Sequence, residues 1–170
     1  MKDPKEIKDD YWRILESTNE WIRFSDQKAG ILLTVYGVIV TVIYSNSDTV
    51  YLALSKSYYQ IFLTIVTVLL SGISITYAFL CLNPSLKNSN PKSIIYFGHV
   101  QAHNKSCNEY IQNSKAILED DTLLIEQEAE QVYINSTIAW KKFRFVSLAI
   151  RFYFLSIFTL LLSLFMYLFL

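Results

Sequence analysis

The fold is decided by the stretch Ile61–Leu82, which reads IFLTIVTVLLSGISITYAFLCL and holds no charged side chain. A helix that crosses a bilayer needs about 20 apolar residues, with about 17 to 25 tolerated. Phe152–Leu170 meets the same condition, and Ala29–Tyr44 is shorter but can be extended by Phe24. A soluble domain of 170 residues would have nowhere to bury three such runs. We therefore predict an all-α integral membrane protein with three transmembrane helices.

The composition supports this prediction, and the placement of charges predicts the orientation of the chain in the membrane. Apolar residues make up 52% of the chain and charged residues only 18%. Met1–Lys28 holds six basic residues and Asn83–Phe145 holds seven, whereas Ser45–Gln60 holds one. Because basic residues near membrane ends stay on the cytoplasmic side, we expect the N-terminus inside and the C-terminus in the periplasm or outside the cell. No signal peptide is recognised in the charged first residues.

The first and last transmembrane helices are expected to be longer than the hydrocarbon layer is thick. A helix over Asp10–Tyr44 would be roughly 50 Å long and one over Thr122–Leu170 roughly 70 Å, against ~30 Å of hydrocarbon. Both would continue into a cytoplasmic helical bundle. The predicted regions are a cytoplasmic amphipathic helix at 1–28, transmembrane helices 1 and 2 with a short outer loop at 29–82, a cytoplasmic helical region at 83–145 and transmembrane helix 3 at 146–170.

Helix-breaking and helix-capping residues predict where the elements between the second and third crossings begin and end. Asn83-Pro84 ends a helix, and the Asn-Ser-Asn-Pro sequence at 88–91 predicts a turn. Ser93–Leu118 is expected to form one further helix, with a break at Gly98. The acidic run at 119–121 is expected to cap the last long helix, because acidic groups favour a helix N-terminus.

Signatures of catalysis are missing from the sequence. It has no Gly-rich phosphate loop, no paired Cys motif and no His-Glu-x-x-His sequence. His99 and His103 are four residues apart, but two His without a third ligand are weak evidence for a metal. We therefore expect neither an enzyme nor a bound cofactor or metal.

Polar and aromatic side chains gather near the predicted inner membrane surface. Cationic groups suit a phosphate, amides suit base edges and aromatic rings stack on bases, so together they meet the demands of a small nucleotide. The alternative is that the charged groups only lock the bundle and anchor it at the headgroups, and spacing alone favours this alternative. The residues concerned are Asn19, Arg23, Asp26 and Lys28 on the first helix, Tyr96, Phe97, His99 and Tyr110 between the crossings, and Gln131, Asn135 and Lys142 on the last helix.

Three stretches, in order, resemble the Pycsar transmembrane effector family over nearly the whole chain. Residues 21–33, WIRFSDQKAGILL, are similar to its "aDtKAgill" signature, and residues 95–100, IYFGHV, to its "YFGhI" element. Residues 131–149 are similar to the closing helix of the family. The chain departs from the usual pattern at Gln27, where Thr is common, and at Phe143, where Tyr is common.

This resemblance implies an antiphage effector in the bacterial inner membrane. In the family a companion cyclase makes cyclic CMP or cyclic UMP on infection, and the effector senses the nucleotide and compromises the membrane, which causes growth arrest or cell death. The implied partners are the lipid bilayer, this mononucleotide and further copies of the chain, but no nucleic acid polymer. The residues expected to bind the nucleotide are Trp21, Arg23, Asp26, Lys28, Tyr96, Phe97, His99, Tyr110, Gln131, Asn135 and Lys142.

Two other functions stay open at this point. One is a membrane scaffold or assembly protein whose inner bundle docks another protein and binds no small ligand. The other is a channel or transporter subunit. Arg151 is the only charged side chain in the predicted crossings, and ion pathways usually carry more.

Overall fold

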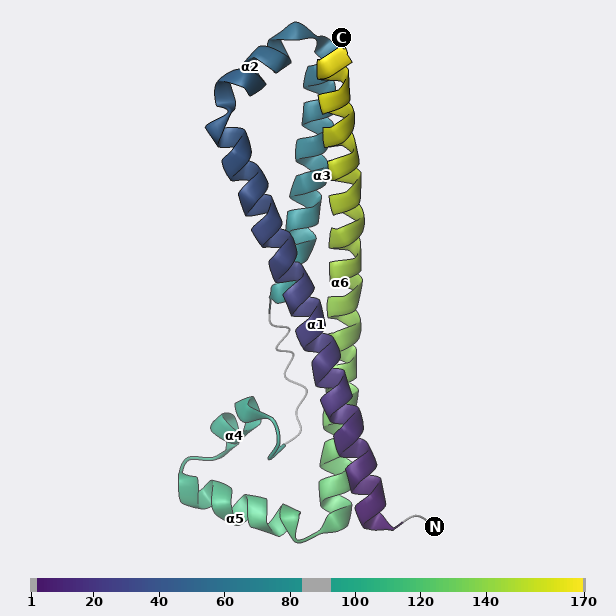
Figure 1. The fold of residues 1–170 in the computed structure, drawn as a ribbon. Coiled ribbons are helices and arrows are strands. Elements are labelled where there is room, and N and C mark those ends of the chain that lie inside the picture. The colour runs from purple at the N-terminus through teal and green to yellow at the C-terminus, as the bar shows by residue number, and fades with distance from the viewer. Residues whose placement is uncertain (1–2, 84–92, 170) are drawn as a thin grey trace. The chain divides into compact units, whose positions relative to one another are not determined.

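The computed structural model describes residues 3–83 and 93–169, and every regular element among them is a helix (Figure 1). Helices α1, α3 and α6 are each long and apolar enough to cross a membrane. The predicted all-α membrane fold is confirmed, whereas the predicted turn at 88–91 lies outside the described residues. The helices are α1 (Pro4–Ser45), α2 (Ser47–Lys56), α3 (Tyr58–Leu82), α4 (Phe97–His103), α5 (Cys107–Leu118) and α6 (Asp121–Phe169).

The chain divides into two compact units. Unit 1 comprises Met1–Arg23 and Ser85–Trp140, and unit 2 comprises Phe24–Pro84 and Lys141–Leu170. Helices α1 and α6 therefore each contribute their charged first half to unit 1 and their apolar second half to unit 2. Unit 1 also holds α4 and α5, and unit 2 holds α2 and α3.

Two predicted helix ends are confirmed by their hydrogen bonds. Asp120 precedes α6, and its Oδ1 accepts from the N–H groups of Thr122 at 2.9 Å and Leu123 at 3.3 Å, as an N-cap side chain should. Helix α3 ends at Leu82, and Asn83 follows in an extended conformation with φ −64° and ψ 122°. The residue before a proline avoids helical geometry, so Asn83-Pro84 ends the helix.

The segment between α1 and α3 differs from the predicted loop, because it contains helix α2. No Pro or Gly interrupts residues 45–60, so nothing in the sequence forbids a helix there. Asn46 separates α1 from α2 with φ −115° and ψ 30°. Its side-chain amide donates to the Val42 carbonyl at 2.9 Å and closes the end of α1.

The segment predicted as one helix over Ser93–Leu118 forms two helices instead. The predicted break at Gly98 is wrong, since Gly98 lies inside α4. The chain breaks after α4, where Ser106 caps α5 by accepting from the Glu109 N–H at 3.2 Å. The Glu109 carboxylate in turn accepts from the Lys105 N–H at 2.8 Å. This reciprocal pattern is a close variant of the capping box.

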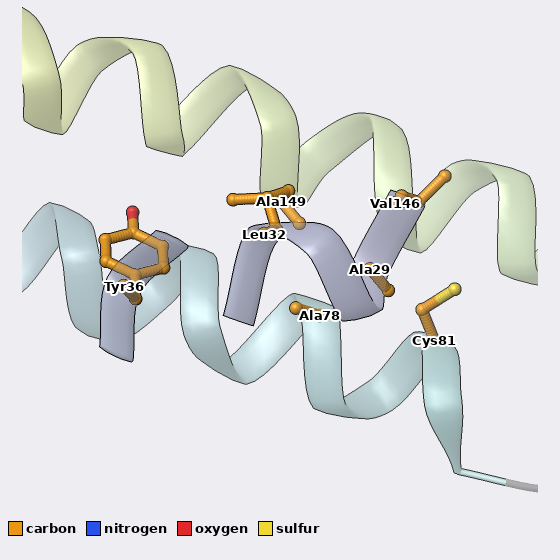
Figure 2. Packing of buried hydrophobic residues seen from close by; sticks show 7 residues of the cluster. All are labelled: Ala29, Leu32, Tyr36, Ala78, Cys81, Val146 and Ala149. Atoms are coloured by element: carbon orange, nitrogen blue, oxygen red, sulfur yellow. The ribbon is translucent and has the colours of Figure 1, made fainter. Parts of the chain in front are cut away.

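The apolar core of unit 2 lies where α1, α3 and α6 meet (Figure 2). Three of its seven residues are alanines, one from each helix, and small residues let helices approach closely, as is usual when helices pack in a membrane. Tyr36 packs edge-on to Tyr153 with ring centroids 5.5 Å apart, and its hydroxyl lies 3.1 Å from that of Ser156. The core residues are Ala29, Leu32 and Tyr36 from α1, Ala78 and Cys81 from α3, and Val146 and Ala149 from α6.

A ladder of hydrogen bonds joins α3 to α6 within unit 2. The α3 side chains recur every seven residues, which keeps them on one face of the helix. The partners on α6 run in the opposite direction, so these two helices are antiparallel. The bonds run from Gln60 to the Ser163 carbonyl at 2.9 Å, from Thr67 to the Thr159 hydroxyl at 2.8 Å and from Ser74 to the Ala149 carbonyl at 2.7 Å.

Candidate functional site

Lys142 in unit 2 ties three helices together. Its side chain is buried, and its ammonium donates to Asp26 of α1 at 2.5 Å and to the Cys81 carbonyl of α3 at 2.8 Å. The Cys81 thiol donates in return to the carbonyls of Lys142 at 3.5 Å and Ser25 at 3.6 Å. We call Asp26, Cys81 and Lys142 the bracket. It neutralises a buried cation and places that cation at the C-terminal end of α3, where the helix dipole favours positive charge.

In unit 1 a chain of amides connects α6 to α1. Gln131 is buried and donates to the Asn135 carbonyl oxygen at 2.8 Å, and Asn135 donates to Asn19 at 2.7 Å. Asn19 is exposed and Asn135 is half-buried, so the chain runs from the interior to the surface. It offers amide donors and acceptors at its exposed end, which is the chemistry predicted for a base edge.

Tyr96 folds back over Gly98 at the beginning of α4. A Cβ on Gly98 would lie 2.6 Å from a ring carbon of Tyr96, so only glycine permits this contact. The Tyr96 ring also meets His99 edge-on, with centroids 5.0 Å apart. His99 is buried, and its Nδ1 accepts from the Ser93 N–H at 3.4 Å. Its other ring neighbour is His103, with centroids 5.7 Å apart.

A contact with α6 holds the segment before α4 in place. Gln127 of α6 accepts from the Ile94 N–H at 3.0 Å. The Ser93 hydroxyl accepts from the N–H groups of Ile95 and Tyr96 at 3.1 and 3.3 Å. These bonds keep residues 93–96 out of a helix and bring the Tyr96–His99 pair close to α6 within unit 1.

Glu128 is a buried carboxyl in unit 1, with an exposed fraction of 4%. Its Oε2 atom is buried and has no hydrogen-bond partner among the described residues. Burial raises the pKa of this carboxyl above its usual range, nearby Lys8 opposes that rise, and Asp9 adds to it. Glu128 was not among the predicted site residues.

The remaining predicted residues are mostly exposed. Arg23 and Lys28 have exposed side chains and no ion-pair partner within the described part of the chain. Trp21 is 55% exposed, and Tyr110 on α5 is half-buried. The side chain of Phe97 lies outside what the structure describes.

The structure groups the predicted residues by unit. Within unit 1 it joins Gln131 to Asn135 and, separately, Tyr96 to His99. Within unit 2 it pairs Asp26 with Lys142. Across residues 3–83 and 93–169 no cluster of three or more His, Cys, Asp or Glu side chains is arranged as a metal site.

Two shallow hollows on the described surface contain none of the predicted residues. Both lie in unit 2 and are lined mainly by apolar atoms, which suits lipid chains better than a charged ligand. One has a volume of about 530 Å³ and is lined by Thr76, Phe79, Leu80, Leu82 and Asn83. The other, of about 550 Å³, is lined by Gln27, Gly30, Ile31, Thr34 and Val35.

Sequence reasoning missed two contributions, and a seven-residue period could have found both. Cys81 belongs to the α3 ladder, since it follows Ser74 by seven residues. Glu128 lies seven residues before Asn135, which in turn lies seven before Lys142. The period places these side chains on one face of each helix.

Comparison with known proteins identifies the family. The family model described as the Pycsar effector protein domain matches residues 10–169. The Pycsar effector protein GmPycTM of Gulbenkiania mobilis is 28% identical over 163 residues, which cover 81% of each chain. PtPycTM of Propioniciclava tarda, another Pycsar effector protein, is 25% identical over 138 residues, covering 79% of this chain and 67% of that protein. No solved structure matches the chain. Because the family model spans nearly all of it, the chain belongs to the Pycsar effector protein family.

Proposed function

We propose that this membrane protein is an antiphage effector that senses cyclic CMP or cyclic UMP on its cytoplasmic side and then compromises the bacterial inner membrane. Family membership supports the effector role. The polar interior of unit 1 supports a cytoplasmic sensing region, and the three apolar helices support the membrane as its target. A companion cyclase would supply the nucleotide, and several copies of the chain would act together.

The observation that carries the sensing proposal is the amide chain of unit 1 beside an uncompensated cation. Arg23 lies one helical turn after Asn19 on α1, so the two share a face. A guanidinium without an ion-pair partner suits a cyclic phosphate, and the exposed end of the amide chain suits the edge of a pyrimidine. Trp21, Tyr96 and Tyr110 supply aromatic surface in the same unit.

The bracket supplies a route for the response in unit 2. It joins the three membrane helices through one ammonium, so a change in α1 or α6 at that point must also disturb the end of α3. The ligand can shift this equilibrium only by its differential affinity for the two states. In this mechanism Lys142 transmits the response, and Lys28 is a neighbouring cation on α1.

Calorimetry with the purified full chain tests direct sensing. We expect heat and a thermal shift with cyclic CMP or cyclic UMP, and neither with cyclic AMP. Arg23→Glu should abolish the signal, while Arg13→Glu, an exposed reversal on the same helix, should retain it. If neither pyrimidine nucleotide gives heat or a thermal shift, or if both reversals behave alike, the sensing proposal fails.

Growth arrest tests the response separately from binding. Lys142→Glu should abolish arrest and leave membrane insertion unchanged, because it breaks the bracket without altering the apolar segments. Lys141→Glu changes an exposed neighbour and should leave arrest intact. Undiminished toxicity of Lys142→Glu would argue against the bracket as the route.

The two native cysteines test the orientation. Cys107 is exposed in unit 1, whereas Cys81 is buried. A membrane-impermeant maleimide should label Cys107 only after the inner membrane is opened, and Cys81 only after denaturation. Labelling of Cys107 in intact spheroplasts would reverse the proposed orientation.

One observation favours a second candidate function, a scaffold without a small ligand. The amides of Gln131, Asn135 and Asn19 already bond to one another, as purely structural groups would. In that case Asn135→Ala should lower stability but leave growth arrest unchanged, and calorimetry should show no nucleotide binding.

A further inference from the structure

One row of polar side chains on α6 faces α1, and a single member of that row in unit 1 has no partner. Asp121, Glu128 and Asn135 follow each other at seven-residue intervals. Asp121 forms an ion pair with Lys8 of α1 at 4.0 Å, and the Asn135 amide donates a hydrogen bond to Asn19 of α1 at 2.7 Å. Glu128 lies midway between them on the same face. It is buried there, with Oε2 unpartnered in the described part of the chain.

The charges around Glu128 do not compensate its carboxylate. From α1, Lys8 and Asp9 act on it with opposite signs, and Lys8 is shared with Asp121. On the other side, the segment before α4 bonds to the adjacent Gln127. The titratable groups of α4 and α5 are His99, which accepts from Ser93, His103, Cys107, Glu109, which accepts from Lys105, Tyr110 and Lys115.

We propose that the buried carboxyl of Glu128 controls how tightly α1 pairs with α6 in unit 1. The pairing tightens when this carboxyl is protonated and loosens when it is ionised. A buried polar atom without a partner costs free energy, and the cost is larger for a charge. The neutral acid removes the charge and leaves the smaller cost. The pairing of the two helices in unit 1 is therefore weakest at pH values where this carboxyl is ionised.

The direction of the pH effect follows from the raised pKa in the folded unit. Such a group favours the paired state below the usual Glu range. That contribution is lost progressively as pH rises through the raised pKa, because the folded unit then holds a buried carboxylate. Lowering the pH should thus close the pair, and raising it through the pKa of this carboxyl should loosen it.

The biological consequence rests on the proposed function, although the device itself does not. Helices α1 and α6 also contribute to unit 2. If unit 1 senses a nucleotide, and the paired and loosened states of α1 and α6 differ little in free energy, a modest binding energy is enough to shift the balance between them. A fully paired row would need a larger differential affinity for the same change.

Hydrogen exchange on the full chain in nanodiscs, without nucleotide, tests the device. The variant Glu128→Gln is nearly isosteric with the neutral acid, and Glu130→Gln removes an exposed carboxylate two residues away. At about pH 8 we expect amides of residues 121–140 to exchange about tenfold more slowly in Glu128→Gln than in the wild type. At about pH 4, below the usual Glu pKa, the two proteins should converge. Glu130→Gln should follow the wild type at both.

Comparing proteins at one pH removes the intrinsic pH dependence of exchange. Equal rates for Glu128→Gln and the wild type at both pH values would overturn the proposal. Faster exchange in Glu128→Gln, or its failure to fold, would also overturn it, since either outcome means that the carboxylate is favourably held. Because no nucleotide is present, failure of the sensing proposal would leave this result untouched.

Discussion

Units 1 and 2 differ at one buried polar group among the described residues, the carboxyl of Glu128. In unit 2 the buried Lys142, Gln60 and Ser74 each have a hydrogen-bond partner on another helix. In unit 1 the buried Glu128 has an unpartnered oxygen within the described chain. In hydrocarbon, where no water is available, an unpaired polar group is too costly to keep, whereas a helical unit in contact with water can tolerate one. In the topology proposed above, this difference favours a firmly packed membrane unit and a unit 1 whose helices are easier to rearrange.

The largest expected effect comes from breaking the bracket. Lys142→Ala leaves Asp26 without its cation and the Cys81 carbonyl without its donor. Removing one partner of a buried ion pair costs about 3–5 kcal/mol of stability. Because Asp26 is partly exposed, we expect the free energy of unfolding to fall by about 3 kcal/mol. Thermal or chemical unfolding in detergent micelles should show it. Lys141→Ala, an exposed control, should change stability by less than about 0.5 kcal/mol. Equal stability of the two variants would remove the contrast between the units.

A smaller effect is expected in unit 1, at Gly98. Alanine there would push the Tyr96 ring away from His99, with a cost of about 1 kcal/mol as an edge-to-face contact is lost. In a Tyr96→Ala background the obstacle is gone, and Gly98→Ala should instead stabilise α4 by about 0.5 kcal/mol. Unfolding of both pairs of proteins checks this reversal of sign. The same sign in both backgrounds would mean that Tyr96 does not require Gly98.

The smallest effect sharpens the comparison within unit 2. A double-mutant cycle with Thr67→Val and Thr159→Val isolates the hydroxyl pair of the ladder. Such bonds between membrane helices average about 0.6 kcal/mol, so we expect coupling of that size. A matching cycle on Asn19 and Asn135 of unit 1 should give no more. Coupling in unit 1 well above that in unit 2 would contradict the inference that unit 1 is the more loosely paired unit.

Most of the fold follows from local signals in the sequence. The uncharged runs predict the spans, Asn83-Pro84 predicts the end of α3, and Asp120 predicts the beginning of α6. The capping pattern of Ser106 and Glu109 was also readable and would have placed the break between α4 and α5. Helix α2 could not be distinguished from a loop by such signals, because its segment has neither a breaker nor a strong apolar period.

The site is less predictable because it depends on how helices align. Asp26 and Lys142 were both selected as polar residues near the inner membrane surface, but their pairing requires the register of α1 against α6. The part of Cys81 in the bracket includes its backbone carbonyl, which no residue pattern reveals. The seven-residue period places Glu128 in the polar row of α6, but its burial and its unpartnered oxygen depend on how α1 packs against α6.

If the protein compromises a bilayer as proposed, the seven-residue ladder of α3 bears on where leakage arises. The side chains of Gln60, Thr67 and Ser74, which could replace part of the hydration shell of a passing ion, are already hydrogen-bonded to α6. This face of α3 therefore does not line a water-filled route within one molecule. Under the proposed function, we expect leakage to arise between neighbouring molecules or from deformation of the surrounding lipid.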